Sequence, residues 1–159
     1  MMAARVITSY ALFGATAQMR YTEPVATLDA DVLITVEDPE RLDLLAPVYR
    51  FCKERGLEPQ GDAVRIGAWP VQFVPVFSPL AEEAVREAET ADFEGEPFRV
   101  VKAVHLAALA LSVGRAKDFA RILALLESGS VGPGELGEVA ARHGLSEAWE
   151  RFQRRFLDA

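Results

Sequence analysis

The chain has 159 residues and a formal net charge of −7; half of its residues are apolar and about a quarter are charged. This length predicts one domain with its own hydrophobic core, and the acidic balance excludes a protein that coats nucleic acid through bulk positive charge. A single cysteine excludes an internal disulfide framework, and with only two histidines we expect no structural zinc site. No apolar run approaches 18 residues, so the sequence predicts no membrane-spanning helix and favours a cytoplasmic protein.

The first 36 residues contain two predicted strands. Residues 6–13 are rich in β-branched and aromatic side chains and end at Gly14, after which we expect a short helix at 15–20. The alternating pattern of residues 27–36 predicts a strand with apolar neighbours on both sides, typical of the interior of a sheet. An alternative for residues 1–17 is a secretory signal, because a charged start, a short apolar stretch and a small-residue triplet follow one another. Polar residues within that stretch favour the buried strand.

The rest of the chain alternates helical and extended patterns until residue 101 and is helical after it. Helices are predicted at 39–55, 80–89, 102–112, 115–127, 135–142 and 146–157, and strands at 63–66, 69–76 and 98–101. The helix at 102–112 is apolar on all sides, which predicts a buried central position. These elements predict an α/β (α+β) fold, with a small mixed sheet and flanking helices in residues 1–101. A C-terminal helical bundle, 102–159, packs on it, and no linker separates the two into independent units.

Asp29-Ala30-Asp31 is the strongest local signal for chemistry. Alternate residues of a strand share a face, so the two carboxylates lie together, and like charges so placed repel unless water or a cation separates them. Mg²⁺ binds one or two protein carboxylates together with waters and substrate phosphates. The alternative is a solvated edge strand whose charges discourage pairing with other chains.

The segment Gly14-Ala15-Thr16 is the second signal. A strand that ends in small residues before a helix can present backbone N–H groups to an anion, and Thr16 adds a hydroxyl. Tight packing alone is the alternative explanation. A third pattern, the G-x-G-x-x-G of residues 132–137, follows a helix rather than a strand and therefore predicts a turn between helices.

Two of these signals resemble the opening of the nucleotidyltransferase superfamily, which has the polymerase-beta-like fold. The resemblance is carried by YALFGA at residues 10–15, TLDADV at 27–32 and GRAKDFARI at 114–122, in that order and spacing. The last stretch is similar to the helical region of a small bacterial branch that includes abortive-infection-type toxins. The resemblance covers residues 6–127, and no single motif decides it.

The resemblance implies a Mg²⁺-dependent enzyme that transfers a nucleoside monophosphate from a nucleoside triphosphate to an acceptor. Asp29 and Asp31 would be the catalytic residues and the metal ligands. Gly14, Ala15 and Thr16 would cradle the phosphates.

In the same comparison, Arg115 and Lys117 would neutralise phosphate charge. Asp118 would have a supporting role, holding Lys117 or the helix pair in place.

The sequence departs from that pattern where charged groups are expected. Gln72 stands on the strand where many members have a third carboxylate, Ala110 replaces an expected lysine, and Glu23 or Asp62 would have to substitute spatially. These departures predict weak or lost catalysis. The alternative function is therefore a non-catalytic nucleotide- or protein-binding module on the same fold.

The partners remain general at this point. We expect a nucleoside triphosphate, an acceptor that is RNA or protein, no membrane and, from base rates, a homodimer. Four arginines gather near the C-terminus, and they predict either pairing with glutamates on the helix surface or a local RNA contact: Arg142, Arg151, Arg154 and Arg155. His105 is predicted to be buried and hydrogen-bonded, Trp69 and Trp149 to be packing residues, and the glutamates of residues 82–89 to form a solvated face.

Overall fold

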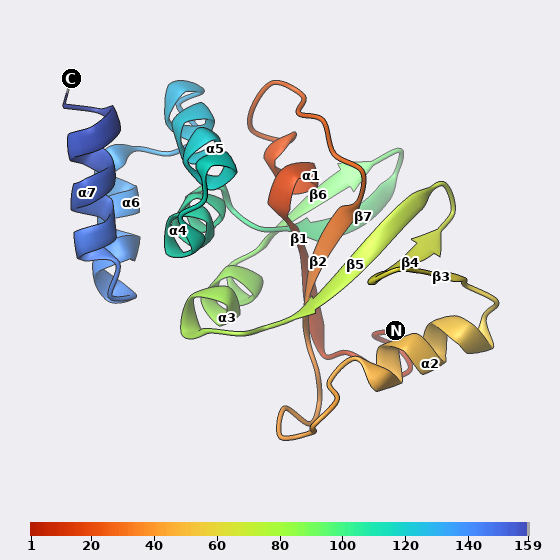
Figure 1. Ribbon diagram of the computed structural model, residues 1–159. Coiled ribbons are helices and arrows are strands. Elements are labelled where there is room, and N and C mark those ends of the chain that lie inside the picture. Colours follow the sequence, from red (N-terminus) through yellow and green to blue (C-terminus); the bar gives the residue numbers. More distant parts are fainter. Residues whose placement is uncertain (159) are drawn as a thin grey trace.

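The computed structural model describes residues 1–158, and its centre is a mixed seven-stranded sheet with strand order β3-β4-β5-β2-β1-β7-β6 (Figure 1). The strands are β1 (Ser9–Phe13), β2 (Ala30–Thr35), β3 (Pro59–Gln60), β4 (Ala63–Ile66), β5 (Trp69–Pro75), β6 (Glu89–Phe93) and β7 (Glu96–Val100). The helices are α1 (Gly14–Gln18), α2 (Ala46–Glu54), α3 (Pro79–Arg86), α4 (Ala103–Val113), α5 (Ala116–Glu127), α6 (Pro133–Arg142) and α7 (Ser146–Phe156). The predicted α+β class is confirmed.

Strand β2 lies at the middle of the sheet, antiparallel to β1 and parallel to β5. Two consecutive residues of β2, Leu33 and Ile34, are fully buried on opposite faces of the sheet. Leu33 belongs to the large core under α3–α7, and Ile34 belongs to a smaller core under α2. Figure 1 shows α2 on one side of the sheet and the helices α3–α7 on the other. Burial on both faces explains why this strand has an apolar run instead of strict alternation.

Helix α4 carries the large core across to the C-terminal helices. Nine of its residues are buried, as its apolar sequence predicts, and it ends at Gly114 in the left-handed conformation. Helices α5, α6 and α7 all pack against it. Trp149 packs in this core and is buried, whereas Trp69 of β5 is 48% exposed and packs only in part. No helix within residues 1–158 has the length and apolar character needed to cross a membrane.

Two element predictions were wrong at their boundaries. The helix predicted over 39–55 begins only at Ala46, because Asp43 accepts the N–H groups of Leu45 and Ala46 and Pro47 occupies the first turn, where its missing N–H costs nothing.

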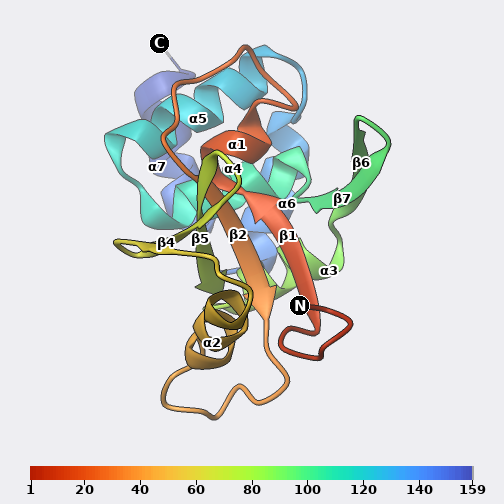
Figure 2. The same ribbon diagram turned by 90° about the vertical axis from the view of Figure 1, so that its right-hand side faces the viewer.

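The helix predicted over 80–89 ends at Arg86, and β6 follows it. Strand β6 pairs with β7 through a two-residue turn, Glu94-Gly95, with φ of 53° and 85°. This hairpin projects from the body of the molecule (Figure 2), so β6 lacks the apolar pattern that marks a buried strand.

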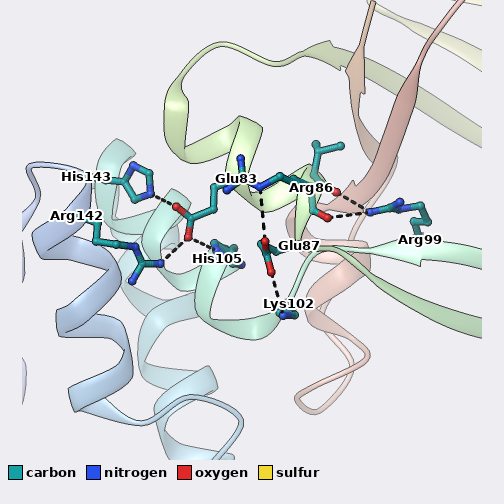
Figure 3. A network of polar contacts seen from close by, with 9 residues as sticks. Glu83, Arg86, Glu87, Arg99, Lys102, His105, Arg142 and His143 are labelled. Carbon is teal, nitrogen blue, oxygen red and sulfur yellow. Dashed lines mark hydrogen bonds and ion pairs between the residues drawn. The ribbon is translucent and has the colours of Figure 1, made fainter.

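Glu83 connects the sheet side of the molecule to the helical side, and its predicted solvation was wrong. Its carboxylate accepts hydrogen bonds from His105 Nε2 at 3.0 Å, His143 Nε2 at 2.5 Å and the Arg142 guanidinium at 2.5 Å (Figure 3). Only 13% of the side chain is exposed. Burial raises the pKa of Glu83, but these three hydrogen bonds outweigh it and lower the pKa from 4.5 to about 2. The carboxylate thus joins α3 to α4 and to the end of α6.

This depressed pKa predicts a pH-dependent contribution to stability. The contribution should be complete above pH 4.5 and lost as the pH falls toward 2, because the unfolded chain then binds the proton more readily. Glu83→Gln should lower the free energy of unfolding at pH 7 by about 1–2 kcal/mol and flatten its decline in acid. Urea unfolding between pH 3 and 7 measures both, with the exposed Glu54→Gln as control. An acid profile of Glu83→Gln that matches the wild type would contradict the role of this carboxylate.

Candidate functional site

The predicted site residues meet where the end of β1 and the starts of β2 and β5 come together. Asp31 lies on β2 directly opposite Phe13 of β1 and Gln72 of β5. Asp29 lies one residue before the strand begins. Figure 2 shows α1 next to this end of the sheet, with α5 beyond it. The interior position of β2 and the proximity of the two carboxylates agree with the prediction.

Gly14 begins α1 in direct contact with Asp31. Its φ is +68°, which an L side chain rarely adopts, and a Cβ built at this position would lie 2.5 Å from Asp31 Oδ2. The site therefore requires glycine here for two independent reasons, the backbone conformation and the space taken by the carboxylate.

Thr16 has a structural contact that its predicted role did not include. Its hydroxyl donates to the backbone carbonyl of Asp29 at 3.1 Å, and the hydroxyl of Thr27 donates to the same carbonyl at 2.8 Å. Two hydroxyls thus hold the backbone just ahead of Asp31. Ala15, between Gly14 and Thr16, is half-buried.

Asp31 is half-buried, and its electrostatic surroundings are mixed. Burial raises its pKa, the charge of Asp29 raises it further, and the cations of Arg121 and Lys117 lower it. The protein therefore holds a carboxylate pair close together under partial burial, with two cations of α5 facing it. An ionised Asp31 costs free energy in this protein, and a bound cation would recover that cost.

Asp118 organises the first turn of α5. Its buried carboxylate accepts from the backbone N–H of Arg115 at 3.0 Å and from Arg115 Nε at 2.7 Å, and it lies 3.9 Å from the Arg121 guanidinium. Burial raises the pKa of Asp118, but the hydrogen bonds from Arg115 outweigh it and lower the pKa. The supporting role predicted for Asp118 therefore takes the form of a contact with two arginines.

Two functional candidates, Arg121 and Gln18, were not identified from the sequence. Arg121 Nε donates to Gln18 Oε1 at 3.0 Å, which joins α5 to α1 across 103 residues of sequence. Both side chains are largely buried, 17% exposed for Arg121, and burial lowers the pKa of Arg121 against the charges of Asp118 and Asp31. The available signal was Arg121 directly before the buried Ile122 on an amphipathic helix.

A shallow cavity of about 250 Å³ extends from Asp29 across β5, β4 and β3. Asp29, Gln72, Asp62 and Gln60 are among its lining residues. Asp62 thus reaches the same cavity as Asp29, while Glu23 is exposed and does not line it. Within residues 1–158, no group of three or more His, Cys, Asp or Glu side chains comes together as a metal-binding cluster.

The donor set that remains suits Mg²⁺ together with a phosphorylated ligand. Mg²⁺ needs only one or two protein carboxylates when waters and phosphate oxygens complete its octahedral shell. Asp29 and Asp31 provide these, Gln72 is the residue of β5 in register with Asp31, and the absent Cβ of Gly14 leaves Asp31 Oδ2 its space. The site fits a metal bound jointly by protein and substrate better than one bound by protein alone.

Comparison with known proteins supports the fold. No protein-family model matches the chain, and no curated protein matches its sequence. Among solved structures, an antigenic nucleotidyltransferase-like protein from Paracoccidioides brasiliensis aligns with a TM-score of 0.53 at 14% identity, over 94% of this chain and 87% of that one. The antibiotic-resistance factor ANT(2'')-Ia aligns with a TM-score of 0.51 at 16% identity, over 97% and 91%. The chain therefore has a nucleotidyltransferase-like fold.

Proposed function

We propose that the protein is a Mg²⁺-dependent nucleotidyltransferase that moves a nucleoside monophosphate from a nucleoside triphosphate to an acceptor. The observation that carries this proposal is the environment of Asp31. Its carboxylate packs against Gly14, lies beside Asp29 and interacts with the charges of Arg121 and Lys117 of α5. A structural cation would not require an open cavity next to the pair, whereas a substrate phosphate would. The nucleotidyltransferase-like fold supports the proposal, and we place the chain in the branch that resembles abortive-infection-type proteins.

The reaction exchanges one bond at the α-phosphorus for another. An acceptor hydroxyl or amine attacks in line, its bond to the α-phosphorus forms, the bond to the β-phosphate oxygen breaks, and pyrophosphate leaves while the acceptor loses its proton to water. Mg²⁺, held by Asp29 and Asp31, would supply positive charge to the triphosphate oxygens. The chain's own groups would bind and orient the nucleotide before this exchange.

Each site residue has a proposed part in that binding. The backbone from Gly14 to Thr16 would approach the phosphates, where no side chain blocks them. Lys117 and Arg115, at the exposed start of α5, would neutralise phosphate charge.

Arg121 would be a positioning residue, because a hydrogen bond to Gln18 and an ion pair with Asp118 hold its guanidinium in place. The acceptor is proposed to be RNA or protein.

Binding without catalysis is the second candidate function, and Gln72 favours it. An amide can neither accept a proton from the acceptor nor offset the charge of a metal as a carboxylate does. Thermal unfolding with ATP, CTP, GTP and UTP, with and without Mg²⁺, tests the nucleotide site, and pyrophosphate release tests turnover. A Mg²⁺-dependent shift without release would support the binding module. No shift with any triphosphate would refute the transfer reaction and nucleotide binding, and would favour a protein-binding module.

Gln72→Asp is expected to increase turnover if the missing carboxylate limits it. The new carboxylate would lie beside Asp31 in the register of β2 and β5 and would add a third anionic donor. We expect pyrophosphate release to rise by about tenfold or more, since general-base assistance contributes roughly 10²–10⁴-fold when well placed. Gln60→Asp, which adds the same charge to the same cavity two strands away, is the matched control. Equal rates in both variants would contradict the role assigned to position 72.

A further inference from the structure

A cavity of about 950 Å³ lies away from the site of Asp29 and Asp31. It is a groove between the end of α4, the start of α5 and the length of α7. Figure 1 shows α7 standing beside α4 and α5 at the far end of the molecule from the α2 side of the sheet. No step of the proposed reaction uses this groove.

The floor of the groove is apolar. Phe119 of α5 and Phe156 of α7 are half-buried, with ring centroids 5.4 Å apart, and Phe152 lies beneath them. Val113, at the end of α4, is 52% exposed on the same groove. Apolar side chains spread over three helices and left half-exposed are typical of a surface that packs against a further helix.

The rim of the groove is cationic, in contrast to the acidic chain around it. Arg151, Arg154 and Arg155 line it together with one carboxylate, Glu147. Arg151 forms an ion pair with Glu147 at 3.6 Å, whereas Arg154 and Arg155 form none within residues 1–158. The cluster therefore holds two cations without an acidic partner beside an apolar floor.

These features favour one occupant over two others. The net charge of −7 repels a polynucleotide, which disfavours RNA as the occupant. In a symmetric contact with a second copy, the three arginines of one face would meet the three arginines of the other, with only one glutamate on each side. An acidic amphipathic helix would pack its apolar side chains on the floor of the groove and pair its carboxylates with the arginines of the rim.

We propose that the α4–α5–α7 groove binds an amphipathic helix of a partner protein, with apolar residues at i, i+3, i+4 and i+7 and acidic residues flanking them. The apolar face covers Val113, Phe119 and Phe156, and the acidic residues pair with Arg154 and Arg155. This binding uses no group of the nucleotide site, so it stands or falls independently of the transfer reaction.

Two synthetic helical peptides of about 18 residues test the proposal on the full chain. Both carry leucine at the same helical spacing, one with glutamate and one with lysine at the flanking positions. By fluorescence anisotropy we expect the glutamate peptide to bind the wild type at least tenfold more tightly than the lysine peptide. Arg154→Glu/Arg155→Glu should weaken it at least tenfold and reverse the preference. Arg41→Glu/Arg50→Glu, with the same charge change on exposed arginines on the α2 side, should leave it unchanged.

Three outcomes would overturn the proposal. The first is no binding of the glutamate peptide, or equal binding to the wild type and to Arg154→Glu/Arg155→Glu. The second is binding of a single-stranded oligouridine that depends on Arg154 and Arg155 and displaces the peptide, which would assign the groove to RNA. The third is a wild-type dimer in light scattering that becomes a monomer in the same variant, which would assign the groove to a second copy of the chain.

Discussion

Asp29→Asn/Asp31→Asn is expected to abolish the Mg²⁺-dependent stabilisation of the protein by a nucleoside triphosphate. A ligand at 100 times its Kd stabilises the folded state by about 2.7 kcal/mol, which corresponds to a rise of roughly 5–10 °C in Tm at this chain length. Removing both carboxylates removes the anionic donors that hold the metal and, through it, the triphosphate. We expect no shift above 1 °C in the double variant and loss of pyrophosphate release.

The same substitution should make the unliganded protein more stable, not less. The pKa of Asp31 is raised by burial and by Asp29, so the folded state prefers the protonated form and stability is lost as the pH rises through that pKa. At pH 7 the ionised pair therefore opposes folding, and asparagine relieves it. Thermal unfolding without ligand measures this, with Glu40→Gln/Glu54→Gln as a control that removes equal charge from exposed positions. A less stable double variant that still responds to Mg²⁺ and triphosphate would refute the site.

Gly14→Ala is expected to be among the most damaging single substitutions in the chain. The left-handed backbone costs an L residue about 1–2 kcal/mol, and the new Cβ, 2.5 Å from Asp31 Oδ2, adds an overpacking cost of about 1–3 kcal/mol. We expect Tm to fall by roughly 5–15 °C and the response to Mg²⁺ and triphosphate to disappear, because the carboxylate must move. Differential scanning calorimetry with and without ligand measures both effects.

Gly56→Ala separates the two causes. Gly56 has a φ of +69°, nearly that of Gly14, but a Cβ there would meet nothing within 4 Å. It should therefore show the backbone cost alone and keep the ligand response. Adding Asp31→Ala to Gly14→Ala should restore part of the lost stability, since it removes the atoms that the Cβ meets. Equal losses in Gly14→Ala and Gly56→Ala would show that the contact with Asp31 carries no energy.

Periodicity in the sequence was enough to predict much of this protein. The apolar residues that flank Asp29 and Asp31 predicted a strand inside the sheet, and the unbroken apolar pattern of 102–112 predicted a central helix. Both follow from local rules, because side-chain direction is set by the repeat of the element itself. Glycine after the first strand likewise indicated the turn at Gly14.

Contacts between distant segments were decided only by the tertiary structure. The pairing of Arg121 with Gln18 and of Glu83 with His105 and His143 joins residues 22 to 103 positions apart, and no local pattern encodes such distances. Strand β6 was missed for a different reason, because an exposed hairpin has no apolar period to detect. The sequence alone therefore determined which elements form and which faces they bury, while the packing of those elements decided which charges meet and where the grooves lie.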